Sequence, residues 1–177
     1  MTEKQILQWI KTNLSPIIDK AITDSGPVQY TTDLLAAMAM REVNFLIARN
    51  HTKPFMVVCE LMKGDYGQRP GEKEKSYHGF GFWQIDIGSF PDFVKSGDWQ
   101  DPYKCCMKAI SVLEGKRKYL TSKLPNVPLN AIVAAYNCGE GRVYKAIKKG
   151  VDVDTYTHNH DYSKEVWRYI DIYNNLI

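Results

Sequence analysis

Residues 31–50, TTDLLAAMAMREVNFLIARN, contain the pattern that most strongly indicates the fold of this 177-residue chain. Apolar residues recur there at steps of three and four positions, which is the spacing of one face of an α-helix. We therefore expect a helix that begins at Thr31 or Thr32 and runs to about Asn50.

A single carboxylate interrupts the apolar stripe of this helix. The positions expected to face inward are Leu35, Met38, Glu42, Phe45 and Leu46. Burying an ionised carboxylate without a partner is costly, so such a group tends to keep its proton and has a raised pKa. A carboxylic acid that is neutral near pH 7 is what general-acid catalysis requires. The alternative is that Glu42 pairs structurally with Arg41, Arg49 or another cation, and periodicity alone does not separate this structural role from the catalytic one.

A second informative segment is 77–86, YHGFGFWQID, which mixes glycine, aromatic and polar residues. Its two glycines allow backbone to approach a ligand closely, and flat aromatic faces suit the apolar faces of sugar rings. Gln84 offers a donor and acceptors for hydroxyl or acetamido groups, and Asp86 adds a second carboxylate. The alternative is a glycine-rich hairpin that fills a core.

The third segment, 134–139, reads AAYNCG and is expected to close a helix, with Gly139 as its C-terminal cap. A Tyr-Asn pair before a helix-ending glycine is unremarkable alone. The pair becomes informative about function only because the other two segments occur in the same chain.

The remaining pattern indicates a mostly helical domain. Thr2 and Gln5 have capping-box spacing, and Ser15-Pro16 predicts a second helix with Ser15 as its cap, which ends near Ser25. Further helices are expected at about 103–122, 128–138, 140–149 and 161–176.

Two stretches are less regular. Residues 54–62 fit a short strand or a helix. The composition of 64–81 predicts a long irregular loop, of a length that in compact domains is usually functional or mobile.

Composition and charge limit the class of protein. With 44% hydrophobic and 24% charged residues, disorder and fibrous architectures are excluded. No apolar run is long enough to span a bilayer, and the N-terminus does not read as a secretory signal. The formal charge is only +3, but residues 104–149 contain ten Lys and Arg against two acidic residues. This bias favours an anionic polymer such as nucleic acid or bacterial cell wall, or it reflects solvated helix faces.

The four cysteines do not indicate a disulfide framework or a zinc finger, because two are adjacent and no Cys-x-x-Cys pair exists. We expect all four to be small buried apolar residues. They are Cys59, Cys105, Cys106 and Cys138.

The three segments occur in the order found in goose-type lysozymes and the related lytic transglycosylases of bacterial cell walls, and the chain resembles this family over roughly residues 30–175. Arg41-Glu42 with the preceding AAMAM resembles the family's helix with the catalytic Glu. GFGFWQID at 79–86 is similar to its Gly-Phe-Gly-Leu-Met-Gln-Val-Asp segment, and AYNCG at 135–139 is similar to its Ala-Tyr-Asn-x-Gly motif. Residues 157–166, THNHDYSKEV, resemble the goose-type Thr-His-x-Asp-Tyr-x-x-Asp-Val pattern.

The resemblance implies a mainly α, lysozyme-like single domain, with an irregular loop or small hairpin beside an active-site groove. Residues 30–177 would form the catalytic domain, and residues 1–29 an N-terminal helical extension packed on the core. Glu42 would be the general acid that protonates the glycosidic oxygen between N-acetylmuramic acid and N-acetylglucosamine, and Asp86 would help to activate water. The residues implied to bind the sugar are Phe82, Gln84, Tyr136, Asn137 and Tyr162.

The chain departs from the family pattern at several positions. Val43 replaces the usual Ser after the Glu, and Trp83 replaces the Met of the glycine-rich motif. The spacing between Glu42 and Asp86 is longer than in the family, with extra residues at about 51–75. A second goose-type Asp has no clean match, and the nearby substitutes are Asp65, Glu72 and Glu74.

The expected function is cleavage of the β-1,4 glycan of peptidoglycan by a monomer at the bacterial cell wall, extracellular or periplasmic. No metal, organic cofactor, nucleic acid or membrane span is implied. Hydrolysis, with acid and base about 6.5–9.5 Å apart in an inverting mechanism, and lytic transglycosylation, with the muramyl 6-hydroxyl as nucleophile, both remain open. The alternatives are a catalytically silent wall-binding module of the same fold and, more weakly, a Cys–His hydrolase. His158 and His160 lack a third metal ligand at motif spacing.

Overall fold

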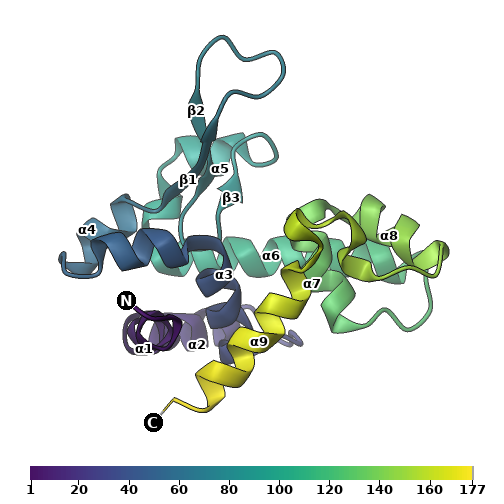
Figure 1. Ribbon diagram of the computed structural model, residues 1–177, viewed down its shortest axis with the longest axis horizontal. Coiled ribbons are helices and arrows are strands. Elements are labelled where there is room, and N and C mark those ends of the chain that lie inside the picture. Colours follow the sequence, from purple (N-terminus) through teal and green to yellow (C-terminus); the bar gives the residue numbers. More distant parts are fainter. Residues whose placement is uncertain (177) are drawn as a thin grey trace.

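The computed structural model describes residues 1–176, which form a mainly helical domain with one small antiparallel sheet (Figure 1). The helices are α1 Glu3–Asn13, α2 Ser15–Asp24, α3 Thr32–Asn50, α4 Phe55–Glu60, α5 Pro91–Lys95, α6 Pro102–Thr121, α7 Leu129–Cys138, α8 Glu140–Lys148 and α9 Tyr162–Asn174. The strands are β1 Lys63–Gly67, β2 Ser76–Phe80 and β3 Ile85–Asp86. The prediction of a mainly α domain is confirmed, and the predicted long helices lie within a few residues of their observed bounds.

The first helix begins as its sequence predicts. The Thr2 amide donates to Gln5 Oε1 (2.8 Å) and the Gln5 amide donates to Thr2 Oγ1 (3.3 Å), which is a capping box. The prediction for the second helix is wrong in one detail. Ser15 is already inside α2, and its hydroxyl contacts the Tyr173 hydroxyl (2.7 Å) rather than capping the helix.

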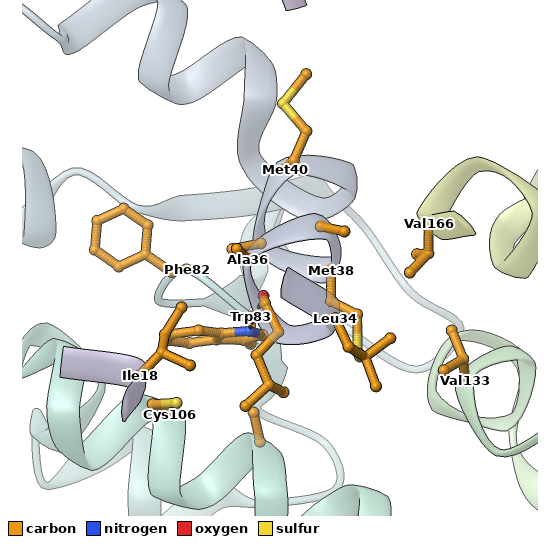
Figure 2. Close-up of a cluster of buried hydrophobic side chains, with 14 of the residues drawn as sticks. Ile18, Leu34, Ala36, Met38, Met40, Phe82, Trp83, Cys106, Val133 and Val166 are labelled. Atoms are coloured by element: carbon orange, nitrogen blue, oxygen red, sulfur yellow. Dashed lines mark hydrogen bonds between the residues drawn. The ribbon is translucent and has the colours of Figure 1, made fainter. Parts of the chain in front are cut away.

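The core surrounds the first half of α3, where every residue from Leu34 to Met40 is buried. Trp83 is fully buried there, and its indole Nε1 donates to the carbonyl oxygen of Leu35 (3.0 Å). Figure 2 shows the indole beside α3, with Ile18 and Cys106 on its other side. Because Ile18 of α2 belongs to the same hydrophobic cluster, the segment 1–29 supplies part of this core.

Helix α3 is bent at Val43, whose φ of −133° and ψ of 18° are not helical, and the bend is visible in Figure 1. The bend rotates the second half of the helix relative to the first. The predicted inward stripe is therefore only partly correct beyond Glu42: Leu46 is partly buried and packs against the core, whereas Phe45 is 70% exposed instead of buried. A β-branched residue is poorly suited to a helix interior, but the sequence pattern alone did not reveal the bend.

The sheet corrects the prediction of an irregular loop at 64–81. Strands β1 and β2 form an antiparallel hairpin in which Gly64 pairs with Gly79 and Tyr66 with Tyr77. Strand β3 extends the sheet on the other side of β2, and Asp86 pairs with Gly79. Figure 1 shows the hairpin projecting well beyond the helices. The ambiguous stretch 54–62 contains helix α4 rather than a strand.

The four cysteines are free. Cys59, Cys105 and Cys106 are buried, as predicted, and burial raises the pKa of each thiol. Cys138 is only half-buried because it ends α7 at the molecular surface, so the prediction that it is buried is wrong.

Within residues 1–176, no helix is both long enough and apolar enough to cross a membrane.

Candidate active site

A cleft of about 1180 Å³ lies between the hairpin and the helical region around α7 and α8. Figure 1 shows these two parts as separate projections from the helical body. Six of the seven residues predicted to form the site line this single cleft, although they come from distant parts of the sequence. They are Glu42, Gln84, Asp86, Tyr136, Asn137 and Tyr162.

Glu42 enters the cleft from the last regular turn of α3 before the bend at Val43. One oxygen of its carboxyl group, Oε1, accepts a hydrogen bond from the hydroxyl of Tyr162. The predicted alternative partner, Arg41, is directed elsewhere: its Nη2 donates to Asp161 Oδ1 (3.1 Å). Glu42 is therefore held by a neutral hydroxyl and is not clamped by the adjacent guanidinium.

Burial raises the pKa of Glu42 to about 7, because the surrounding protein disfavours its charged form. The hydrogen bond from Tyr162 and the positive charge of Arg41 act in the opposite direction, but they are weaker. A carboxyl group with this pKa is substantially protonated at neutral pH. It can therefore donate a proton to a bound ligand.

Two tyrosines flank this carboxyl group. Burial raises the pKa of both Tyr136 and Tyr162 well above the ordinary value, and the nearby charge of Glu42 adds to the effect. The Tyr136 hydroxyl donates to the carbonyl oxygen of Trp83 (2.7 Å). Both phenols thus stay neutral, and Tyr162, which was predicted to bind substrate, uses its hydroxyl to orient Glu42.

Gln84 occupies a space that two paired glycines leave open. A Cβ atom on Gly64 would lie 2.2 Å from Gln84 Oε1, and one on Gly79 would lie 2.4 Å from it, so neither position accepts a larger residue without displacing the amide. Gln84 Nε2 donates to the carbonyl oxygen of Gly81 (2.9 Å). Gly64 of β1 and Gly79 of the motif therefore leave room for Gln84 at the wall of the cleft.

Asp86 is an ion-paired carboxylate. Its Oδ1 accepts from Arg69 Nη1 (2.6 Å), and its Oδ2 accepts from the amide and hydroxyl of Ser89 (2.8 Å each). Burial raises its pKa, but the hydrogen bonds from Arg69 and Ser89 outweigh burial and hold the pKa below the ordinary value. In contrast to Glu42, Asp86 is ionised at neutral pH and is a weak base.

The three substitute carboxylates of the hairpin have different environments. Asp65 lines the cleft and accepts from Arg69 Nη2 (2.8 Å). Glu72 contacts Nε2 of the buried His78 (2.8 Å), and this hydrogen bond raises the pKa of the imidazole. Glu74 is exposed and does not line the cleft. Only Asp65 is thus placed to act together with Glu42 and Asp86.

Phe82 is the one predicted site residue that does not line the cleft, so this prediction is wrong. Its ring is 1% exposed and packs against Phe55 and Trp9, with ring centroids 6.3 and 6.2 Å away. The turn after β2 directs Phe82 and Trp83 into the core, while Gln84, with a φ of 47°, points back to the cleft. Phe82 therefore stabilises the fold and does not line the groove.

Asn137 lies at the opposite wall of the cleft, where α7 ends. Its side-chain Oδ1 accepts from the amide of His158 (2.9 Å), so it joins α7 to the segment before α9. Asn137 is exposed and lines the cleft.

A buried carboxylate that the sequence analysis missed anchors the start of α9. Asp154 is 0% exposed and accepts hydrogen bonds from the amide (3.0 Å) and the hydroxyl (2.7 Å) of Ser163. Ser163 follows Tyr162 directly in the sequence. Asp154 therefore fixes the first turn of α9 and, through it, the tyrosine that contacts Glu42.

Four cations line the cleft, Arg41, Arg69, Lys116 and Arg142, and of these the sequence motifs had included only Arg41. Lys116 donates to Glu140 (2.5 Å), whereas Arg142 makes no ion pair within residues 1–176. Lys116 and Arg142 belong to the basic run at 104–149, which was the available sequence signal. Arg69 could not be foreseen, because its position depends on the conformation of the hairpin.

Within residues 1–176, no group of three or more His, Cys, Asp and Glu side chains is arranged to hold a metal ion.

Neither a scan against protein-family models nor a search of the curated proteins finds a match to this chain.

Proposed function

We propose that this protein is a peptidoglycan-degrading glycosidase with a lysozyme-like fold, related to goose-type lysozymes and lytic transglycosylases. It cleaves the β-1,4 bond between N-acetylmuramic acid and N-acetylglucosamine at the bacterial cell wall. The observation that carries the proposal is Glu42, a carboxyl group that lines a large cleft and whose pKa burial raises to about 7. Protonation of the leaving glycosidic oxygen requires a group of this kind.

The size and charge of the cleft support a polymeric, anionic substrate. A volume of about 1180 Å³ exceeds the usual range for a small-molecule pocket, about 300–1,000 Å³. Arg142, which is free of carboxylate partners in the described chain, faces the same space. Its charge complements the carboxylates of the peptides that substitute the muramyl residues.

Between the two possible products, the state of Asp86 favours the transglycosylase product. A hydrolase of the inverting type needs a second carboxylate free to activate water, but Asp86 is bound to Arg69 and Ser89. In transglycosylation, Glu42 first protonates the departing oxygen as its bond to the anomeric carbon breaks, and the muramyl 6-hydroxyl then bonds to that carbon from the same face of the ring. The resulting Glu42 carboxylate then accepts the hydroxyl proton, so a single carboxyl group completes the reaction.

Mass spectrometry of purified peptidoglycan after digestion tests this proposal. We expect disaccharide-peptides with 1,6-anhydromuramic ends, because the reaction is intramolecular. Reducing muramic ends would show that the enzyme is a hydrolase. Intact glycan after prolonged incubation with folded protein would contradict the proposed function and would favour a catalytically silent wall-binding module.

The rate should depend on pH through the ionisation of Glu42. Only the protonated carboxyl group can donate, so the rate is expected to be constant below its pKa and to fall about tenfold per pH unit above a midpoint of about 7. Initial rates of glycan cleavage between pH 5 and pH 9 measure this, with circular dichroism at each pH to show that the fold is intact. A rate that is undiminished at pH 9 would contradict the assignment of Glu42 as the acid.

A further inference from the structure

The β1–β2 hairpin presents a pair of aromatic rings that the core does not use. Tyr66 is 62% exposed and Tyr77 is 44% exposed, and they are directly paired across the two strands. Their ring centroids are 4.8 Å apart, with an angle of 51° between the ring planes. Rings of this size usually bury most of their surface, so an exposed pair marks a contact surface.

The strand register places this pair on the same face of the hairpin as residues of the cleft wall. Side chains alternate between the two faces along β2, so Tyr77 shares a face with Gly79, over which the side chain of the cleft residue Gln84 lies. Gly79 lines the cleft and pairs with Asp86, which also lines it. The two tyrosines do not line the cleft themselves; they lie on the same face as Gly64 and Gly79, further along the hairpin, which extends beyond the helices in Figure 1.

The surroundings of the pair favour a carbohydrate over an apolar protein partner. The hairpin tip beyond the tyrosines is polar and exposed, with Lys73, Glu74, Lys75 and Ser76 in sequence. An interface for a protein would have a contiguous apolar centre, which this tip lacks. An aromatic ring surrounded by hydrogen-bonding groups matches a pyranose, which has an apolar face and a polar edge.

We propose that Tyr66 and Tyr77 form an outer subsite, which stacks against a sugar ring of the same glycan strand whose scissile bond lies at Glu42. This inference rests on the proposed function, since the strand must pass through the cleft to reach the hairpin. A cross-strand aromatic pair also stabilises a hairpin. The experiment must therefore separate binding from folding.

The test compares Tyr66→Ala/Tyr77→Ala with the wild-type protein on long glycan strands freed of peptide and on a tetrasaccharide of the same repeat. We expect kcat/KM on long strands to fall about tenfold, mainly through a higher KM, with a loss at least about fivefold smaller on the tetrasaccharide. Phe45→Ala removes an exposed ring that does not line the cleft and should match the wild type. Equal losses on both substrates, or none, would overturn the subsite.

Binding separates this inference from the proposed function. In a Glu42→Gln background, co-sedimentation with insoluble peptidoglycan should show about tenfold weaker binding when both tyrosines are replaced by alanine. If the wild-type protein cleaves nothing but this difference persists, the proposed reaction fails and the glycan subsite stands. If binding is unchanged by the tyrosine substitutions, the subsite is refuted even when cleavage is observed.

Discussion

Glu42→Gln is expected to lower the rate of peptidoglycan cleavage by about 10²–10⁴-fold, the usual contribution of a positioned general acid. Glutamine has the same shape as glutamic acid, and its amide oxygen can still accept the hydrogen bond from Tyr162. It cannot donate an acidic proton to a leaving oxygen. The rate of clearing of a cell-wall suspension measures the effect.

The matched control is Glu74→Gln, which makes the same chemical change at an exposed position outside the cleft. It should clear the suspension at the wild-type rate. Equal clearing by Glu42→Gln and the wild type would refute the catalytic assignment.

The stability of Glu42→Gln distinguishes a catalytic carboxyl group from a structural ion-pair partner. The folded-state pKa of Glu42, about 7, is above its ordinary value of 4.5, so folding favours the protonated form. The free energy of unfolding of the wild type should therefore decrease as the pH rises from 4.5 through 7. The variant lacks this decrease and should be at least as stable as the wild type at pH 8. A variant that is clearly less stable at pH 8 would instead indicate that the negative charge of Glu42 stabilises the fold.

Trp83→Ala is expected to lower the free energy of unfolding by about 3–5 kcal/mol, the cost of removing a large buried aromatic ring. Trp83 is 0% exposed, and its indole joins the sheet segment to α3 through the hydrogen bond to Leu35. The carbonyl oxygen of the same residue accepts the hydrogen bond from Tyr136. Loss of this side chain therefore also loosens one wall of the cleft. Chemical denaturation measures the change.

Phe45→Ala is the control for this prediction, because its ring is 70% exposed. It should change the free energy of unfolding by less than about 0.5 kcal/mol. If Trp83→Ala does not fold, Trp83→Phe retains an aromatic ring and loses mainly the indole hydrogen bond, at an expected cost of about 1–3 kcal/mol. A loss below about 1 kcal/mol for Trp83→Ala would contradict its central place in the core.

Local sequence patterns were sufficient to predict most of the helices. The capping box at Thr2 and the apolar periodicity of 31–50 depend on residues within a few positions of one another, and both predictions are confirmed. The bend at Val43 was not predictable in this way, because it depends on how the two halves of α3 pack against different neighbours. It is the bend that exposes Phe45, which periodicity had assigned to the core.

For the candidate site, too, local motifs predicted some features, whereas others depend on contacts between distant parts of the chain. Motifs identified Glu42, Gln84 and Tyr136, which line one cleft. What the motifs could not predict is which side chains contact one another across the fold. Tyr162 lies 120 positions from Glu42 yet provides its hydrogen bond, and Arg69 neutralises Asp86 from a hairpin that composition had indicated as irregular.

The sequence also did not predict in which direction each side chain points at the tight turn of residues 81–84. Phe82 and Gln84 are two positions apart, and the family resemblance implied that both would lie in the groove. The segment 81–84 is instead a turn, so Phe82 points into the core and Gln84 to the cleft. The burial of Asp154 was not predicted, because no local pattern marks a single acidic residue in a connecting segment as buried.

The most direct test of the central claim is an NMR titration of the carboxyl group of Glu42, with the resonance assigned by its absence in Glu42→Gln. The carboxyl carbon shift, followed from pH 3 to pH 9, should change with a midpoint of about 7. A midpoint near 4.5, the ordinary value for a glutamate, would mean that this side chain carries no proton at neutral pH, and the proposed catalysis would lose its acid.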